Sequence, residues 1–353
     1  MGLDSREPAL PARDATLSYL LQPLRPFLGR PGVLEVALNK PGVVFVEDSQ
    51  GWTRHEVPEL TLEKCRHMAT ATANFTEGNK SLRDSPLLGA TLPSGERVQF
   101  ALPPVVHTDT ISITIRKPPT VSPTMEDIRP LFNRVVPYSN ELQDHDRELL
   151  ELYKAGRYWD FLHRAVQLRK TIVVSGHTGA GKTFVLKALA EAIPCHARLV
   201  TIENVAELLL PHHENSVHLF YADSVVRQEV PGQQRAITAK ELLSASLRMR
   251  PDWVILAEAR SGDCFDFIDM AASAHPGLTS VHAESPALCF ERMALMVRRS
   301  PEGAGLGHQE IKRLLAMTVD VIAQFGHDGS GRHISQVYFN PQRKLQLARE
   351  IME

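Results

Sequence analysis

Residues 176–183 of this 353-residue chain are Gly-His-Thr-Gly-Ala-Gly-Lys-Thr, and this stretch decides the fold. It follows the β-branched segment 171–175 and precedes a helix-forming stretch at 184–192. A strand, a glycine-rich loop ending in Lys and Thr, and a helix, in that order, are the context that a phosphate-binding loop requires. A glycine-rich turn without a ligand would rarely match every one of these positions. We therefore expect the chain to bind a nucleoside triphosphate.

Each residue type in this loop has a chemical reason. Glycine lets the backbone curl around phosphates, so that successive N–H groups and the helix N-terminus face the anion. Lys182 adds a mobile positive charge near the β- and γ-phosphates, and the Thr183 hydroxyl is placed to ligate Mg²⁺. The nucleotide contacts predicted from the loop are Gly176, Thr178, Gly179, Ala180, Gly181, Lys182 and Thr183.

The composition narrows the class of protein. Hydrophobic residues make up 43% of the chain and charged residues 23%, as in ordinary globular proteins. The formal net charge of −2 gives no general attraction to polyanions, so direct nucleic-acid binding is not expected. The four cysteines form no C-x-x-C pair, which argues against a disulfide scaffold or zinc knuckle and fits a reducing cytoplasm. Residues 1–6 lack the apolar segment of a secretory signal, and no apolar run is long enough to span a bilayer.

The length allows two domains, and the pattern changes along the chain. Residues 1–117 predict a strand-rich α+β domain, with alternating apolar residues at 34–38, 43–46, 97–101 and 111–115 and helical spacing at 60–75. Residues 118–160 predict a linker and helix, because prolines accumulate there before a segment of helix formers. These prolines are Pro118, Pro119, Pro123, Pro130 and Pro137, with a short helix expected at 125–132.

Residues 161–353 predict a second domain in which strands alternate with helices. The expected strands are 172–174, 199–202, 217–220, 253–256, 278–281, 319–325 and 334–338. This alternation is typical of an α/β domain with a largely parallel sheet, where ligands bind at the carboxyl ends of the strands.

Three glutamates are candidates for the chemistry. Phosphoryl transfer to water needs a metal clamp, a group that orients or deprotonates the water, and positive charge. Glu258 follows the apolar strand 253–256, and we expect it to hold Mg²⁺ through water, with direct activation of water as the other possibility. Glu203 ends another apolar strand and Glu207 follows four residues later, a spacing that puts both carboxylates on one face of a helix near the same metal-bound water. Solvated or capping acids are the alternative for each.

Basic residues complete the predicted site. His282 closes the strand 278–281 and is expected to contact a γ-phosphate or to respond to it through a hydrogen bond. Arg248, Arg250 and Arg260 bracket the strand that leads to Glu258, and arginine suits bidentate contacts to phosphate. Surface solvation is the alternative for each arginine.

Taken together, the motifs resemble those of the traffic ATPases of type IV secretion and conjugative DNA transfer, within the wider secretion and pilus-motor ATPase family. Residues 176–183 match the phosphate loop, and Thr-Ile-Glu-Asn-Val-Ala-Glu at 201–207 matches the acidic box. Arg-Met-Arg-Pro-Asp at 248–252 with Ile-Leu-Ala-Glu-Ala-Arg at 255–260 matches the second nucleotide motif, and residues 274–283 match the histidine box. Two departures, Asn204 for the usual Asp and Ala257 for the usual Gly, predict modest turnover.

The resemblance implies a C-terminal RecA-like ATPase domain that uses ATP and Mg²⁺. It also implies a homo-hexameric ring in the cytoplasm, peripheral at the inner membrane of a bacterium and attached through components of a secretion channel. Arg116 from the N-terminal domain would reach the nucleotide. Closure about the linker would drive substrate translocation or pilus biogenesis. The length of the linker also allows one subunit's N-terminal domain to lie over its neighbour's ATPase domain.

Three alternatives to a motor of type IV secretion stay open. A type II secretion or pilus-assembly motor commonly carries paired C-x-x-C motifs, which this chain lacks. A DNA-translocating or strand-exchange protein needs a basic or aromatic groove, for which an aromatic content of 6% gives little support. A nucleotide-controlled assembly switch with little turnover would suit Asn204 and Ala257. Nothing in the sequence distinguishes DNA, effector or pilin as cargo.

Overall fold

The computed structural model describes residues 12–76, 82, 85–118, 122–132, 134–136, 139–222 and 236–353. The N-terminal residues on which the secretory-signal expectation depends lie outside these ranges, as do Pro119 and Pro137. The chain forms two compact units. The first comprises Met1–Pro119, Ser224–Ile237 and Arg248–Arg250, and the second comprises Thr120–Asp223, Thr238–Leu247 and Pro251–Glu353.

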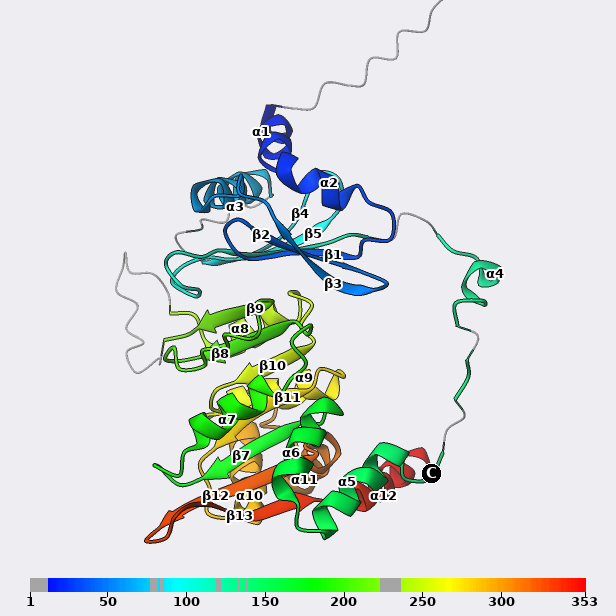
Figure 1. The fold of residues 1–353 in the computed structure, drawn as a ribbon, viewed down its shortest axis with the longest axis vertical. Coiled ribbons are helices and arrows are strands. Elements are labelled where there is room, and N and C mark those ends of the chain that lie inside the picture. Colours follow the sequence, from blue (N-terminus) through cyan, green and yellow to red (C-terminus); the bar gives the residue numbers. More distant parts are fainter. Residues whose placement is uncertain are drawn as a thin grey trace, which may run out of the picture. The chain divides into compact units, whose positions relative to one another are not determined.

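The first unit is built on a six-stranded antiparallel sheet in the order β3-β2-β1-β6-β5-β4. Its strands are β1 (Glu35–Lys40), β2 (Val43–Asp48), β3 (Gly51–Glu56), β4 (Leu87–Thr91), β5 (Arg97–Ala101) and β6 (Ser112–Arg116). One face carries the helices α1 (Ala12–Leu20), η1 (Gln22–Leu24), α2 (Arg25–Leu28) and α3 (Leu62–Phe75) (Figure 1). Alternate strand residues such as Val36 and Leu38 pack against Met68 of α3, so this unit has a core of its own.

The second unit contains a seven-stranded sheet in the order β13-β12-β7-β11-β10-β8-β9. All neighbouring strands are parallel except β12 and β13, which form an antiparallel hairpin. The seven strands predicted from the sequence are all present, and the prediction of a largely parallel sheet is confirmed. They are β7 (Ile172–Gly176), β8 (Leu199–Glu203), β9 (Ser216–Phe220), β10 (Trp253–Leu256), β11 (Gly277–Val281), β12 (Val321–Asp328) and β13 (Gly331–Phe339).

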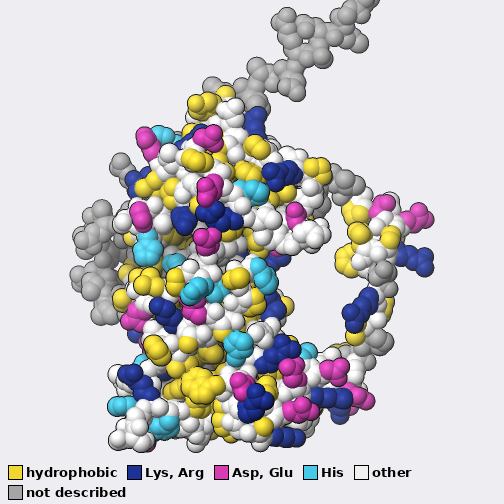
Figure 2. All heavy atoms as spheres, viewed as in Figure 1, with side chains coloured by type: hydrophobic (Ala, Val, Ile, Leu, Met, Phe, Trp, Pro, Cys, Tyr) yellow, Lys and Arg dark blue, Asp and Glu magenta, His cyan; other side chains and the backbone are white. Residues whose placement is uncertain are grey.

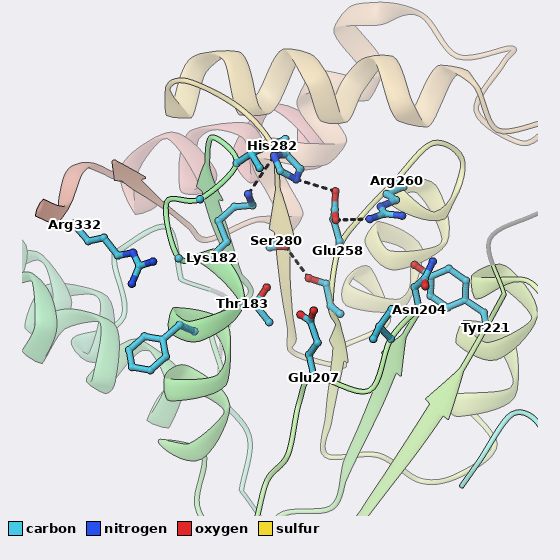
Figure 3. Close-up of a pocket in the computed structure, with 16 residues that line it drawn as sticks. Lys182, Thr183, Asn204, Glu207, Tyr221, Glu258, Arg260, Ser280, His282 and Arg332 are labelled. Carbon is cyan, nitrogen blue, oxygen red and sulfur yellow. Dashed lines mark hydrogen bonds and ion pairs between the residues drawn. The ribbon is translucent and has the colours of Figure 1, made fainter. Parts of the chain in front are cut away.

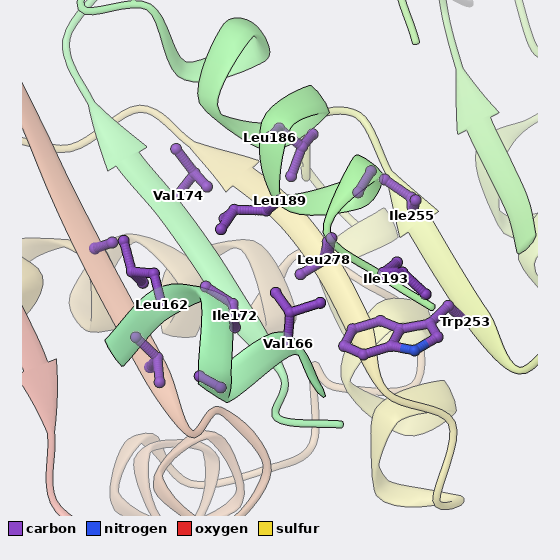
Figure 4. Packing of buried hydrophobic residues seen from close by; sticks show 14 of the residues in the cluster. Leu162, Val166, Ile172, Val174, Leu186, Leu189, Ile193, Trp253, Ile255 and Leu278 are labelled. Carbon is purple, nitrogen blue, oxygen red and sulfur yellow. The ribbon is translucent and has the colours of Figure 1, made fainter. Parts of the chain in front are cut away.

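Helices cover both faces of this parallel sheet (Figure 1). Helices α5 (Asp144–Lys154), α6 (Tyr158–Gln167) and α7 (Lys182–Glu191) bury their apolar faces in one core. Trp253 of β10 is fully buried in that core together with Ile172 of β7 and Leu189 of α7 (Figure 4). The other face is covered by α8 (Ala239–Ser246), α9 (Asp263–Ala272), α10 (Pro286–Arg298) and α11 (His308–Thr318).

Two helices lie apart from these layers. Helix α12 (Pro341–Met352) packs on α11, and α4 (Met125–Ile128) lies in the proline-rich segment. Helix α4 is shorter than the predicted 125–132 stretch. The predicted domain boundaries at residues 117 and 160 stay predictions, although α5 and α6 belong to the core of the second unit.

The parallel sheet determines where a ligand site can form. Because β7, β8, β10 and β11 run in the same direction, their carboxyl ends meet at one edge. The segments that follow them carry the phosphate loop, Glu203, Glu258 and His282. Residues more than 100 positions apart in the chain are therefore gathered at this edge.

The described helices are short, and both signs of charge appear on the face shown in Figure 2. Within the described ranges, no helix has the length and apolar character needed to cross a bilayer. Figure 2 shows basic and acidic side chains interspersed over the visible face, with neither sign dominating.

The four cysteines differ in burial. Cys65, Cys264 and Cys289 are buried, and Cys195 is exposed. Burial raises the pKa of Cys65 to about 11 and that of Cys289 to about 12. The buried thiols therefore stay protonated at neutral pH.

Candidate nucleotide-binding site

The loop between β7 and α7 has the backbone shape that its glycines predict. A Cβ on Gly176 would lie 2.6 Å from the Phe325 carbonyl oxygen of β12, so only glycine fits where the two strands meet. Gly179 and Gly181 have φ angles of 84° and 90°, in the left-handed region that favours glycine. The Ala180 side chain lies in the core, so a contact from that residue to a ligand would have to come from its backbone.

A cavity of about 550 Å³ opens beside this loop (Figure 3). Its volume falls in the range of ordinary small-molecule sites. Most of the predicted site residues line it, and they come from the loop itself and from the segments that follow β8, β10 and β11. These residues are Thr178, Gly179, Gly181, Lys182, Thr183, Glu207, Glu258, Arg260 and His282.

Four of these side chains form one connected row across the cavity (Figure 3). The Lys182 Nζ lies 3.1 Å from the His177 carbonyl oxygen and 3.2 Å from the His282 Nδ1. The His282 Nε2 lies 3.3 Å from one Glu258 oxygen, and Arg260 donates a 2.9 Å hydrogen bond to the other. The carboxylate of Glu258 therefore lies between Arg260 and His282, and His282 lies between Glu258 and Lys182.

The contacts in this row determine how His282 is protonated. An ammonium group only donates, so Nδ1 must accept from Lys182, and Nε2–H then donates to Glu258. Burial, followed by the charge of Lys182, lowers the pKa of His282 below its ordinary 6.5. Burial also lowers the pKa of Lys182, and Glu258 opposes part of that change. We infer that His282 is the neutral tautomer with its proton on Nε2.

Glu203 lies beneath the cavity and does not line it. Its carboxylate is fully buried and accepts hydrogen bonds from the Thr201 hydroxyl at 2.6 Å and from the backbone N–H groups of Glu207 and Leu208 at 2.9 and 2.8 Å. Burial alone would raise the pKa of Glu203, but hydrogen bonds from His218, Thr201 and the backbone lower it overall. Glu203 thus holds the following loop in place, and its predicted catalytic role stays a prediction.

The Glu207 side chain lines the cavity, but the local backbone structure that places it there differs from the one predicted from the sequence. The helical spacing assumed for Glu203 and Glu207 is wrong, because residues 204–206 form a bend and no helix follows β8. The bend is stabilised by Glu203 itself, whose carboxylate binds the Glu207 N–H. Within the described part of the chain, the Glu207 carboxylate has no hydrogen bond or ion pair. It lines the cavity near Thr183 (Figure 3).

Three predicted arginines belong to the first unit. Arg116 ends β6 and lies 3.7 Å from the Glu35 carboxylate. Arg250 donates a 2.8 Å hydrogen bond to the buried Glu47 carboxylate. Arg248 belongs to the same short segment. Contact between these arginines and a nucleotide stays a prediction.

Several lining residues were not predicted from the sequence. Arg332 of β13 is the most important, because its guanidinium lies 3.3 Å from the position that a Cβ on Gly181 would take. Ser280 of β11 donates a 2.7 Å hydrogen bond to the Ala257 carbonyl oxygen and so fixes the backbone just before Glu258. The remaining unpredicted lining residues are Phe184, Asn204, Val205, Tyr221 and Ala257.

The oxygen-bearing side chains of the cavity fit a magnesium ion bound mainly by phosphate. Thr183 supplies a hydroxyl, and Glu207 and Glu258 supply carboxylates. Among the described residues, no group of three His, Cys, Asp or Glu side chains is placed to hold a metal by itself. Mg²⁺ in nucleotide sites typically takes one or two protein ligands and completes its shell with phosphate oxygens and water, so this donor set suits it.

The fold and the site define a class of protein, and comparison with known proteins identifies the family. The model of the family described as "Type II/IV secretion system protein" matches residues 20–325. The chain therefore belongs to the type II/IV secretion system protein family. The prediction of a traffic ATPase of type IV secretion, made from four motifs, is confirmed by its relatives.

Within the family, the chain is similar to named type IV secretion proteins. It is 46% identical to the type IV secretion system protein VirB11 of Brucella suis over 343 residues, which cover 95% of this chain and 93% of the relative. It is 37% identical to PtlH of Bordetella pertussis over 337 residues, or 94% and 97% of the two chains. The crystal structure of the Brucella suis VirB11 ATPase in complex with sulphate matches with a TM-score of 0.88 and 45% identity, covering 96% of this chain and 98% of that one.

Proposed function

We propose that this chain hydrolyses ATP in the cavity beside the phosphate loop and acts as a motor of a type IV secretion system. One observation carries the proposal. Lys182, Thr183, Glu207 and Glu258, from three separate segments, line a single cavity at the carboxyl edge of the parallel sheet. Membership of the secretion ATPase family supports the same function.

The loop and Lys182 bind the phosphates. A γ-phosphate oxygen is a stronger acceptor for the Lys182 ammonium than the neutral His282 ring, because the resulting hydrogen bond joins two opposite charges. Arriving triphosphate therefore draws Lys182 away from His282. Arg332, beside Gly181, adds a second positive charge on the opposite side of the loop. The backbone N–H groups at the start of α7 complete the anion site.

Thr183 would hold magnesium directly, and Glu258 would hold it through water. When bound, Mg²⁺ neutralises charge on the β- and γ-phosphate oxygens. Arg260 and His282 occupy both Glu258 oxygens and keep the carboxylate in place.

Glu207 activates the water. Its carboxylate lines the cavity and has no hydrogen-bonding partner among the described residues, so it is free to accept a proton. A bond forms from the water oxygen to the γ-phosphorus as the bond to the β-bridging oxygen breaks, and the water proton passes to Glu207. The products are ADP and inorganic phosphate.

The proposal extends to the assembly. Six copies form a ring peripheral to the bacterial inner membrane, held there by components of the secretion channel, and cycles of nucleotide binding and release move cargo or pilus subunits. Family membership and the matches to VirB11 and PtlH support this extension. Particle images of the protein with and without ATP test it, because a ring should be visible and should change shape with nucleotide.

Substitution of Lys182 tests the site. Lys182→Ala should lower steady-state ATP hydrolysis by about 10²–10³-fold, the usual cost of losing one charge-stabilising donor. Lys187→Ala is the matched control, because Lys187 lies on the same helix and does not line the cavity. Hydrolysis by Lys182→Ala at the original rate would show that the catalytic site lies elsewhere. Negligible phosphate release by the unaltered protein, with tight nucleotide binding, would favour an assembly switch instead.

A further inference from the structure

A second cavity, of about 340 Å³, adjoins the nucleotide cavity. The two cavities share three lining residues, Glu258, Arg260 and His282. The Glu258–His282 pair, with its 3.3 Å contact, therefore forms part of the wall between them (Figure 3). The hydrolysis proposed for the nucleotide cavity does not by itself assign a role to this second cavity.

The second cavity is lined by positive charge from two elements. Arg260 and Ser261 lie in the loop between β10 and α9. Arg292 lies in α10, and Arg299 caps the C-terminus of that helix seven residues later. The loop is close to the helix end, since a Cβ on Gly262 would lie 3.6 Å from the Ser300 Cα. This contact brings the three guanidinium groups to one cavity.

The positive charge in this cavity exceeds the negative charge. Among the described residues that line it, Glu258 is the only acid, and Arg260 and His282 already contact its two oxygens. The side chains of Arg292 and Arg299 have no ion pair or hydrogen bond among the residues that the structure describes. The three arginines therefore face the single carboxylate of Glu258 among the described lining residues. Like charges held together favour an anion between them.

The shape and chemistry of the lining favour a small oxyanion. Guanidinium groups match the planar oxygen pairs of phosphate, and the Ser261 hydroxyl offers one more donor. The apolar part of the lining is small, with Ala259, Leu295 and Met296, and no Phe, Tyr or Trp is among the described lining residues. The lining therefore has the charged donors that a phosphate group needs.

We propose that this arginine cavity is an exit site that receives the inorganic phosphate cleaved from the nucleotide. The inference rests on the proposed function, because the phosphate is the product of the adjoining cavity. The two cavities are linked because they share a wall. When the γ-phosphate is cleaved, Lys182 returns to His282. The Glu258–His282 pair then lies between the cleaved phosphate and the two arginines that line only the second cavity, Arg292 and Arg299.

Crystals of the full-length chain soaked in tungstate, a heavy oxyanion, test the site directly. An anomalous peak is expected between Arg260, Arg292 and Arg299 in the unaltered protein and in Lys182→Ala. The peak should disappear in Arg292→Gln/Arg299→Gln and persist in Arg298→Gln, the matched control, because Arg298 lies on the same helix but does not line the cavity. Absence of the peak from the unaltered protein would overturn the proposal.

Product inhibition by inorganic phosphate tests whether the arginine cavity takes part in ATP hydrolysis. In Arg292→Gln/Arg299→Gln, the inhibition constant of added inorganic phosphate on ATP hydrolysis should rise at least about tenfold, since two charged hydrogen-bond donors are lost. Inhibition by ADP, which binds at the phosphate loop, should not change. Arg298→Gln should leave both constants as they were. An unchanged phosphate constant in the double variant contradicts the inference.

The results separate the exit site from the proposed function. If Lys182→Ala loses hydrolysis but the unaltered protein shows no tungstate peak, the ATPase site is supported and the exit site is rejected. If Lys182→Ala hydrolyses ATP at the full rate and a tungstate peak appears at the arginines, the proposed ATPase site is wrong. The arginine cavity would then bind free phosphate from solution, and the proposal that it receives phosphate cleaved from the nucleotide would also be rejected.

Discussion

Gly176 shows how one residue joins the phosphate loop to the sheet. It ends β7 where the backbone of β12 passes close by, and its missing side chain leaves room for the Phe325 carbonyl oxygen. The sequence motif predicts a glycine here for the sake of the phosphates. The structure gives a second reason, which is packing between strands.

Gly176→Ala should therefore destabilise the protein whether or not nucleotide is present. A methyl group 2.6 Å from a backbone oxygen forces the strands apart, and overpacking of this kind costs about 1–3 kcal/mol in the free energy of unfolding. Urea denaturation followed by fluorescence measures it. Gly305→Ala is the control, because a Cβ there meets nothing within 4 Å. Equal stability of Gly176→Ala and the unaltered protein would refute the packing argument.

Glu203 should contribute to stability in a pH-dependent way. Its pKa in the folded protein is below the ordinary value of 4.5, so the folded state holds its proton less tightly than the unfolded state. The resulting stabilisation is fully present above pH 4.5 and is lost as the pH falls through the folded pKa. Glu203→Gln removes the titration and the charged hydrogen bonds, at a cost of about 1–3 kcal/mol at pH 7.

Urea unfolding of the two proteins at pH 7, 5 and 4 measures this effect. The stability difference between the unaltered protein and Glu203→Gln should stay constant from pH 7 to 5 and shrink at pH 4. Glu207→Gln should show no such difference, because its carboxylate has no partner among the described residues. A stability gap for Glu203→Gln that does not change with pH would mean that its charge has no role in folding.

The two glutamates also show what the sequence could not resolve. The acidic box and the strand before it are visible in the sequence, and both carboxylates were predicted for the site. Their different roles depend on the bend at 204–206 and on His218 of the neighbouring strand β9, which are tertiary features. Lys182, Thr183, Glu258 and His282 line one cavity because parallel strands bring their carboxyl ends together, whereas their roles stay predictions.

At the scale of elements, the β12–β13 hairpin reaches the nucleotide cavity from the far end of the chain. Strand β12 pairs with β7 along its length, and β13 turns back to place Arg332 beside Gly181. No local motif marks Arg332, since its partner lies about 150 residues earlier in the sequence. The strands themselves were predictable, whereas this contact was not.

Arg332→Gln should weaken nucleotide binding more than it slows chemistry. We expect the KM for ATP to rise by about 5- to 50-fold, the range for one charged contact to phosphate, with a smaller change in kcat. Arg343→Gln, on α12 and outside the cavity lining, is the matched control. Steady-state kinetics separate the two constants. A change confined to kcat would mean that Arg332 acts on the transition state alone.

The two edge strands of the first unit could not be predicted from the alternation of apolar residues. Strands β3 and β4 lie at the two edges of its sheet and were not predicted. Gly-Trp-Thr-Arg-His-Glu in β3 and Leu-Leu-Gly-Ala-Thr in β4 lack a clear apolar alternation. Edge strands need less apolar surface and often carry charge, so their pattern is weaker than that of the central strands.

At the scale of the whole molecule, each unit has its own hydrophobic core. The described lining of the nucleotide cavity comes entirely from the second unit. Tryptophans report on the units separately, since Trp52 lies in the first and Trp159 and Trp253 lie in the second. Ligand binding should therefore affect the two cores unequally.

Heating should unfold the two units in separate transitions, and nucleotide should shift mainly the second. A non-hydrolysable ATP analogue with Mg²⁺ at about 100 times its Kd should add about 2.7 kcal/mol to the stability of the second unit. Calorimetry resolves the transitions, and fluorescence of Trp52→Phe assigns the one that belongs to the second unit. A single transition that moves as a whole would show that the units unfold together.

The burial of three of the four thiols has a practical consequence. Cys195 is the only cysteine with an exposed side chain, and the other three are both shielded and protonated at neutral pH. A maleimide dye should thus attach once per polypeptide without any engineered substitution. Counting stepwise bleaching of single fluorescent particles would then give the number of copies in the working assembly.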